Sequence, residues 1–308
     1  MIKVTILGCG SAKPTAERHP SAQVVNVNEQ YFLVDAGEGV QQQMFRCGLN
    51  PLRLRAVMVS HLHGDHIFGL FPLISTLGMY GRRTPLQVYA PAPFGEILDH
   101  FLRHFESELP YAVQWMEVDT VRSGPVFSNR TVEVRSIPLS HRIPTAGYLF
   151  REREPALNVD KAAIERYGLA VSQIVAAKRG EDVTLADGRT IPNAAITYRP
   201  FEPASYAYCS DTASDSGIAR CAAGVDLLYH EATYADDMAV QAAQRGHSTA
   251  SEAARCALAA GAGRLLIGHF SSRYKDAQPL LDEARRIFPS ADMAVEGETY
   301  TISKPNER

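Results

Sequence analysis

The sequence predicts one α/β domain in which helices cover β-sheets, and two observations support this fold class. Short runs of β-branched and aromatic residues, bounded by Gly, Pro or Asn, alternate with amphipathic stretches in both halves of the chain. The chain has 308 residues, of which 45% are hydrophobic and 21% charged, and this suits one large globular domain. We therefore treat residues 1–308 as a single domain.

The first half opens with strands and then alternates strands with helices. Strands are predicted over residues 4–7, 23–28, 31–34, 56–60 and 86–90. Helices are predicted over residues 40–45, 67–77 and 94–105. Residues 113–150 are mostly β in pattern.

The alternation resumes after residue 203. Strands are predicted over residues 206–210, 227–230, 265–268 and 293–295, and helices over residues 248–260 and 277–288. Residues 151–203 differ, because they are polar and show only one predicted helix, at 160–167, and a turn at 187–188. We expect this segment to be an inserted arm that is mostly irregular and has no core of its own.

The most specific motif lies where a predicted strand meets a predicted helix. It reads Ser60-His61-Leu62-His63-Gly64-Asp65-His66. Its imidazole nitrogens and carboxylate oxygens suit Zn²⁺ best among common metals, with Mn²⁺ as a possible substitute. With only 10 His in the chain, such a concentration is improbable by chance. A metal site is therefore favoured over a His-rich surface turn.

Further candidate ligands fall just past the C-terminal ends of other predicted strands. They are His141, Asp211, Glu231 and His269. In layered α/β folds this edge of a sheet is where sites are built. Each residue alone would more often be structural, but together they complete the ligand set that two ions need. Asp211 is the natural carboxylate to bridge two ions.

These and other motifs together resemble those of ribonuclease Z, a family within the metallo-β-lactamase superfamily. The first motif matches the HxHxDH pattern of the superfamily. The stretches similar to ribonuclease Z are Asp35-Ala36-Gly37-Glu38-Gly39 with Gln43, His230-Glu231-Ala232-Thr233-Tyr234, Gly246-His247-Ser248-Thr249 and His269-Phe270-Ser271-Ser272-Arg273-Tyr274. Near the start, Pro14, Thr15, Arg18 and Ser21 fit a PTxxRNxxS pattern, but His19 stands where the family has Asn.

The resemblance implies an αββα sandwich, with two mixed sheets flanked by helices and two Zn²⁺ ions at one edge. One ion would be held by His61, His63 and His141. The other would be held by Asp65, His66 and His269, with Asp211 as the bridge.

The resemblance also implies catalytic roles. Asp65 would accept a proton from the attacking water. His247, oriented by Glu231, would serve the leaving oxygen, or else it merely flanks a helix that has Ser248 as its N-cap. Arg273 would contact a phosphate or form a structural salt bridge.

The implied reaction is removal of 3′ trailers from pre-tRNA, with a 3′-hydroxyl left on the tRNA and a 5′-phosphate on the trailer. The arm at 151–203 would bind the body of the tRNA, and one subunit of a homodimer would present it to the other. Basic and acidic residues nearly balance in this arm, and only Lys178-Arg179-Gly180 resembles the basic turn of the family. Lys178 and Arg179 are therefore the candidate RNA contacts there.

Two alternatives stay open, a di-zinc phosphodiesterase for a small substrate and a non-catalytic binding protein. The net charge of −3 argues against a general nucleic-acid binder, and no DNA partner is expected. The 5 cysteines show no CxxC spacing, and no apolar run approaches the roughly 20 residues of a membrane span. We expect a cytoplasmic protein with no membrane partner.

Overall fold

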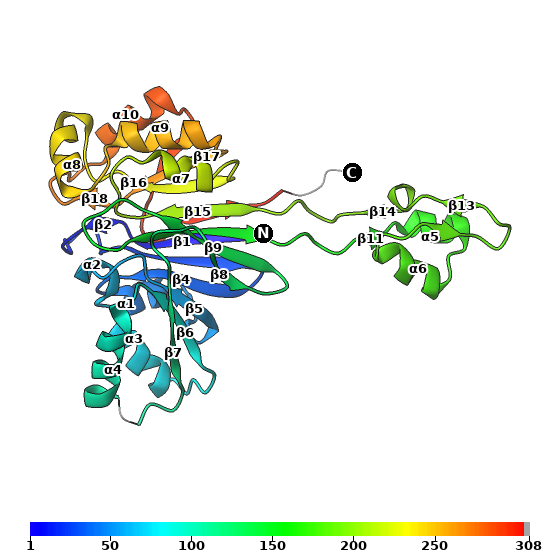
Figure 1. The fold of residues 1–308 in the computed structure, drawn as a ribbon, viewed down its shortest axis with the longest axis horizontal. Coiled ribbons are helices and arrows are strands. Elements are labelled where there is room, and N and C mark those ends of the chain that lie inside the picture. The colour runs from blue at the N-terminus through cyan, green and yellow to red at the C-terminus, as the bar shows by residue number, and fades with distance from the viewer. Residues whose placement is uncertain (107, 305–308) are drawn as a thin grey trace.

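Two seven-stranded sheets form the centre of the computed structural model, which describes residues 1–106 and 108–304 (Figure 1). The first sheet has the order β20 (Thr299–Ile302), β1 (Ile2–Gly8), β3 (Ala22–Val27), β4 (Gln30–Ala36), β5 (Leu54–Met58), β6 (Leu86–Ala90) and β7 (Val113–Glu117). The second has the order β19 (Ala291–Met293), β17 (Arg264–Gly268), β16 (Leu227–Glu231), β15 (Ser205–Cys209), β10 (Ala146–Glu152), β9 (Val132–Pro138) and β8 (Pro125–Ser128).

Each sheet is mixed, as predicted. Strands β20 to β4 of the first sheet pair antiparallel, and β4 to β7 pair parallel. In the second sheet, β19 to β15 pair parallel and β15 to β8 antiparallel. The parallel parts bring several strand ends to one edge of the molecule.

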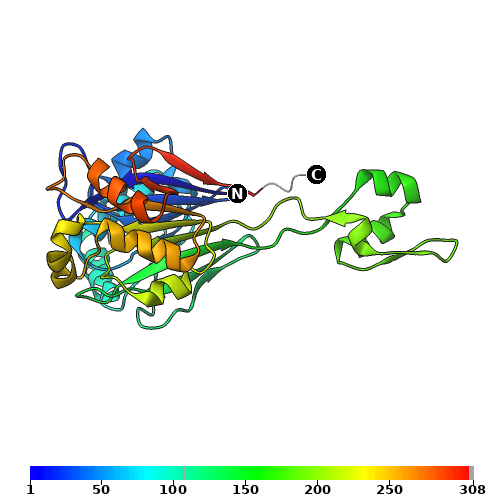
Figure 2. The ribbon, with the colours of Figure 1, turned by 90° about the horizontal axis from the view of Figure 1, so that it is seen from above.

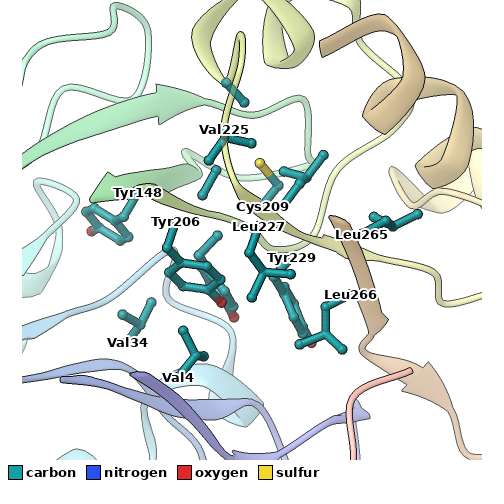
Figure 3. Close-up of a cluster of buried hydrophobic side chains, with 14 of the residues drawn as sticks. Val4, Val34, Tyr148, Tyr206, Cys209, Val225, Leu227, Tyr229, Leu265 and Leu266 are labelled. Atoms are coloured by element: carbon teal, nitrogen blue, oxygen red, sulfur yellow. The ribbon is translucent and has the colours of Figure 1, made fainter. Parts of the chain in front are cut away.

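Helices cover the outer face of both sheets. Helices α1 (Val40–Arg46), α3 (Leu70–Met79) and α4 (Phe94–Phe105) pack on the first sheet, and α7 (Ser216–Cys221), α9 (Ala250–Ala260) and α10 (Gln278–Ile287) on the second. Between the sheets, Tyr148 and Tyr206 of the second face Val4 and Val34 of the first (Figure 3). The predicted αββα sandwich is confirmed. Among the described residues, no helix has the length and apolar character to cross a membrane.

Several element boundaries differ from the prediction. The helix expected over 67–77 is two helices, α2 (Gly64–Ile67) and α3. The chain breaks because Gly69 N donates to Ala36 O at 2.8 Å, and a Cβ on Gly69 would lie 2.1 Å from Gly37 O. Helix α7, helix α8 (Ala239–Arg245) and strand β20 were not predicted.

The segment 151–203 is not irregular, contrary to the prediction. It leaves the body at the end of β10, returns at β15, and its outer part stands away from the sandwich (Figures 1 and 2). That part contains β11 (Asn158–Val159), α5 (Lys161–Tyr167), α6 (Val171–Lys178), β12 (Val183–Thr184), β13 (Thr190–Ile191) and β14 (Thr197–Tyr198). The turn at Asp187-Gly188 is present, because Leu185 N donates to Arg189 O.

The outer part of the arm also has a small core, which corrects a second expectation. The buried side chains are Val159, Ala163, Leu169, Ala177, Val183 and Ile196. They come from short elements, so no single stretch shows a long hydrophobic period. These side chains are nevertheless buried together, because α5 and α6 pack against the strand pairs β11–β14 and β12–β13.

Candidate metal centre and active site

The candidate ligands lie at one edge of the sandwich, at the ends of strands from both sheets. The loop after β5 carries His61 and His63, and the adjoining helix α2 carries Asp65 and His66, whereas the loops after β9, β15 and β17 carry His141, Asp211 and His269. In Figure 1 this edge lies near the labels α2, β2 and β18, opposite the end from which the arm projects. The sandwich therefore brings residues more than 200 positions apart into one cluster.

The first ligand group combines three imidazoles with one carboxylate. His63 Nδ1 lies 3.0 Å from His61 Nε2 and 3.3 Å from His141 Nε2. Asp211 Oδ2 lies 3.6 Å from His61 Nε2 and 3.8 Å from His141 Nε2. Ligands about 2.0–2.1 Å from a tetrahedral zinc ion are about 3.3 Å apart, so these four atoms fit one ion.

The second group combines two imidazoles with two carboxylates. His66 Nε2 lies 3.4 Å from both Asp65 Oδ2 and Asp211 Oδ1. His269 Nε2 lies 3.1 Å from Asp211 Oδ1 and 3.6 Å from Asp65 Oδ2. The two oxygens of Asp211 therefore face different groups, as a bridging carboxylate requires.

Two unpartnered nitrogens show that this chemistry suits metal ions. The Nε2 atoms of His66 and His269 are buried and have no hydrogen-bond partner among the described residues. A buried polar atom without a partner is costly, unless a ligand takes its place. Burial, followed by the neighbouring His66, holds the pKa of His61 well below its ordinary value, so its ring is neutral and offers a lone pair. The cluster fits a pair of metal ions.

In three of the histidine ligands, the ring nitrogen outside the ligand groups, Nδ1, contacts a neighbouring residue. Asp35 accepts a hydrogen bond from His66 Nδ1 at 2.8 Å. Thr233 Oγ1 lies 2.9 Å from His269 Nδ1, and Gly246 O lies 2.7 Å from His141 Nδ1. Such partners fix the orientation of a ligand ring and its tautomer.

Asp35 is a site residue that the sequence did not assign. Its carboxylate also accepts hydrogen bonds from Ser60 N at 2.7 Å, Ser60 Oγ at 2.9 Å and Tyr208 OH at 2.6 Å. The sequence signal for a role of Asp35 was its position at the end of β4, where it begins the stretch Asp35-Ala36-Gly37-Glu38-Gly39. Its partners come from remote strands, so spacing alone could not reveal them.

His247 and Glu231 are brought together beside the cluster. His247 Nδ1 lies 2.8 Å from Glu231 Oε1, and Glu231 also accepts hydrogen bonds from Thr212 N and Thr233 N. Burial lowers the pKa of His247, but the negative charge of Glu231 outweighs it and raises the pKa to about 9. The imidazole therefore carries a proton at neutral pH.

Ser248 is not the N-cap of the following helix, contrary to one of the two interpretations. Helix α9 begins at Ala250, and Thr249 is its N-cap in a capping box with Glu252. The hydroxyl of Ser248 instead donates to Thr212 O at 2.7 Å. This bond ties the loop that carries His247 to the loop after Asp211.

An open pocket of about 520 Å³ adjoins the cluster. Asp65, Asp211 and His247 line it together with Glu38 and Phe68, the last of which is 66% exposed. The opening gives solvent and an extended substrate access to the ligand groups.

The predicted substrate contacts are divided between two places. Arg273 lies in a second pocket beside His247, with its guanidinium 5.4 Å from the centre of the Tyr234 ring. Within the described part of the chain it forms no salt bridge, and the phosphate contact stays a prediction. Lys178 and Arg179 lie at the end of α6 in the arm, far from the cluster (Figure 1).

Solved structures with the same fold define the class of protein. The short form of human tRNase Z matches with a TM-score of 0.71 and 23% identity, over 97% of this chain and 99% of that one. A metallo-β-lactamase fold protein of Bacillus subtilis matches with a TM-score of 0.69 and 21% identity, over 97% and 98%. These likenesses define a protein of the metallo-β-lactamase fold, and its ligand cluster is a candidate metal centre.

Sequence relatives define the family. Ribonuclease Z of Porphyromonas gingivalis strain W83 is 47% identical over 285 residues, which are 92% of this chain and 94% of that protein. Ribonuclease Z of Bacteroides fragilis is 42% identical over 291 residues, or 94% and 96%. A family model described as Anti-Pycsar protein Apyc1 matches residues 2–163, and this region ends before Asp211. The chain belongs to the ribonuclease Z family, which confirms the resemblance.

Replacing Asp35 tests the support of the cluster. Asp35→Ala should lower metal affinity by about 10- to 100-fold, because His66 loses the partner that orients it. It should also lower the free energy of unfolding by about 1–3 kcal/mol for each buried donor that is left unpaired. Metal titration and thermal unfolding measure the two effects. Asp99→Ala removes an exposed carboxylate on α4 as the control, and equal metal affinity in the two variants would contradict the prediction.

Proposed function

We propose that this chain is a zinc-dependent endoribonuclease that removes 3′ trailers from pre-tRNA by hydrolysis of a phosphodiester. The observation that carries the proposal is the pair of ligand groups that share Asp211 beside the Glu231–His247 pair. Membership of the ribonuclease Z family supplies the substrate class. The products would be a tRNA with a 3′-hydroxyl and a trailer with a 5′-phosphate.

The two ligand groups would hold two Zn²⁺ ions, with Mn²⁺ as a possible substitute. His61, His63 and His141 would bind one, Asp65, His66 and His269 the other, and Asp211 both. When bound, a pair of zinc ions supplies Lewis acidity, which lowers the pKa of water and stabilises negative charge at phosphorus.

The side chains around the ions would handle the protons. Asp65 Oδ2 faces the cluster and would accept the proton of the attacking water. As the water oxygen bonds to phosphorus, the bond from phosphorus to the 3′-oxygen breaks. His247 would then give its proton to the departing 3′-oxygen, and Glu231 would keep the imidazole oriented and charged.

The direction of the arm supports the proposal of a homodimer. The arm leaves the sandwich at the end opposite the ligand cluster, so it points away from the active site of its own chain (Figure 1). In a two-fold dimer it can hold the tRNA body while the partner subunit cuts. Lys178 and Arg179 would contact phosphates there. A cytoplasmic location fits this substrate.

The arm also bears on the small-substrate alternative. A small phosphodiester would occupy only the pocket over the cluster and would gain nothing from a folded unit far from it. Remote binding energy is useful when a large substrate must be positioned. We therefore favour pre-tRNA.

Cleavage should depend on two zinc ions per chain. Purified protein should convert a 3′-extended pre-tRNA into the two products named above, and chelation should abolish this until Zn²⁺ is returned. Metal analysis should find about two equivalents per chain, and Asp211→Ala should lose metal and activity together because both groups share it. Full activity with one equivalent at most would rule out the two-ion mechanism.

His247 should be needed for turnover but not for metal binding. His247→Ala should keep its zinc and lose roughly 10²-fold or more in kcat, as expected when a general acid is removed. A donor works while protonated, so activity should fall as pH rises through the pKa of His247. Glu231→Gln removes the charge that raises this pKa, and the alkaline limb of the kcat profile should then move to lower pH. If the alkaline limb does not move, a titrating group other than His247 is responsible for it.

Replacing the outer part of the arm, residues 158–198, with a short Gly/Ser linker should separate binding from chemistry. Hydrolysis of bis(p-nitrophenyl) phosphate should persist, because the deletion lies far from the cluster. The value of kcat/KM for pre-tRNA should fall steeply, because the substrate is no longer positioned. Light scattering should show a dimer for the intact protein. Unchanged pre-tRNA processing by the shortened enzyme would favour the small-substrate alternative.

A further inference from the structure

A second pocket of about 560 Å³ adjoins the one over the metal cluster. Besides His247, four cationic side chains line it, and each comes from a different segment of the chain: Lys13, Arg142, Arg245 and Arg273. Lys13 follows β2 (Gly10–Ser11), and Arg273 follows β18 (Phe270–Ser271), the strand that pairs with β2. We name this feature the basic pocket. Among the residues that the structure describes, no carboxylate lines it.

The charge of the basic pocket is not neutralised by the protein. Over residues 1–106 and 108–304, none of its four cations forms an ion pair with a carboxylate, although the whole chain carries a net charge of −3. Tyr234 holds two of them in place. Its hydroxyl accepts from Arg245 Nη1 at 3.1 Å, and its ring lies under Arg273. A group of cations without carboxylate partners favours an anion with several charges.

The two pockets are continuous at one wall. Ser11, Ala12, Arg142 and His247 line both of them. The metal pocket is also lined by Pro14, Pro20, Glu38 and Phe68, which lie outside the basic pocket and offer no cation. An RNA strand that runs from these residues past His247 would therefore enter the positively charged pocket.

We propose that the basic pocket binds the backbone phosphates on the 5′ side of the cleaved bond, which are the last phosphates of the tRNA itself. This assignment rests on the proposed function. The departing 3′-oxygen belongs to the nucleotide that stays on the tRNA, and His247 faces that oxygen. The retained strand then continues past His247 into the basic pocket. The trailer leaves over Phe68 and Glu38, where no cation holds its phosphates.

Protein variants combined with modified substrates test on which side of the cleaved bond the basic pocket binds phosphates. Arg245→Ala and Arg142→Ala should each lower kcat/KM for pre-tRNA by roughly tenfold, the effect of losing one charge-assisted hydrogen bond. Each should also reduce the magnitude of the slope of log(kcat/KM) against log[salt] by about 0.7. Arg286→Ala, which removes an exposed arginine of α10, is the matched control and should leave both unchanged.

The substrates carry one neutral methylphosphonate, placed either one phosphate before or one phosphate after the cleaved bond. The loss caused by Arg245→Ala should vanish with the first substrate and persist with the second. The opposite pattern, or an equal loss on both, would overturn the assignment.

Fluorescence anisotropy provides a readout that does not need cleavage. Zinc-loaded protein should bind a short single-stranded RNA that ends in a 3′-hydroxyl more tightly than a trailer with a 5′-phosphate. The double variant Arg142→Ala/Arg245→Ala should lose this preference. If pre-tRNA is not cleaved but the preference holds, the proposed function fails and the basic pocket stands. Equal binding by the double variant and Arg286→Ala would overturn the basic pocket itself.

Discussion

The buried carboxylate of Asp35 is the interaction on which the candidate site depends. A charge in the interior is tolerated only when hydrogen bonds replace its water, and Asp35 accepts four of them. Three come from residues of the first sheet and its loops, and one comes from Tyr208 on the second sheet. Asp35 itself has a left-handed backbone, with φ of 56°, which costs energy for a residue with a Cβ. The hydrogen bonds offset that strain.

The same division between sheets runs through the ligand set. The segment after β5 of the first sheet, which includes α2, supplies His61, His63, Asp65 and His66, and three loops of the second sheet supply His141, Asp211 and His269. Neither sheet holds a complete group by itself. Metal binding would therefore stabilise the contact between the sheets, because ions bind only the assembled edge. In this architecture the complete site therefore forms only when the two sheets have packed together.

Much of the body could be predicted because its elements are local patterns. Strand β6 and helix α4 have the predicted boundaries, since a short, mostly apolar run marks the strand and an amphipathic period marks the helix. The break before α3 escaped prediction because it depends on the approach of Gly69 to Gly37, a contact between remote segments. The core of the arm, the support by Asp35 and the basic pocket were missed for the same reason. Each is formed by residues from several segments of the chain, and the spacing of these residues in the sequence follows no common pattern.

The arm has its own small core, which shares no side chain with the two cores of the body. Two extended segments are its only described covalent connections to the sandwich (Figure 2). Substitutions in one unit are therefore nearly independent, in packing terms, of substitutions in the other. Natural selection can change the arm while the hydrolytic body stays fixed. Over evolutionary time such a protein can acquire a different arm while its ligand cluster is unchanged.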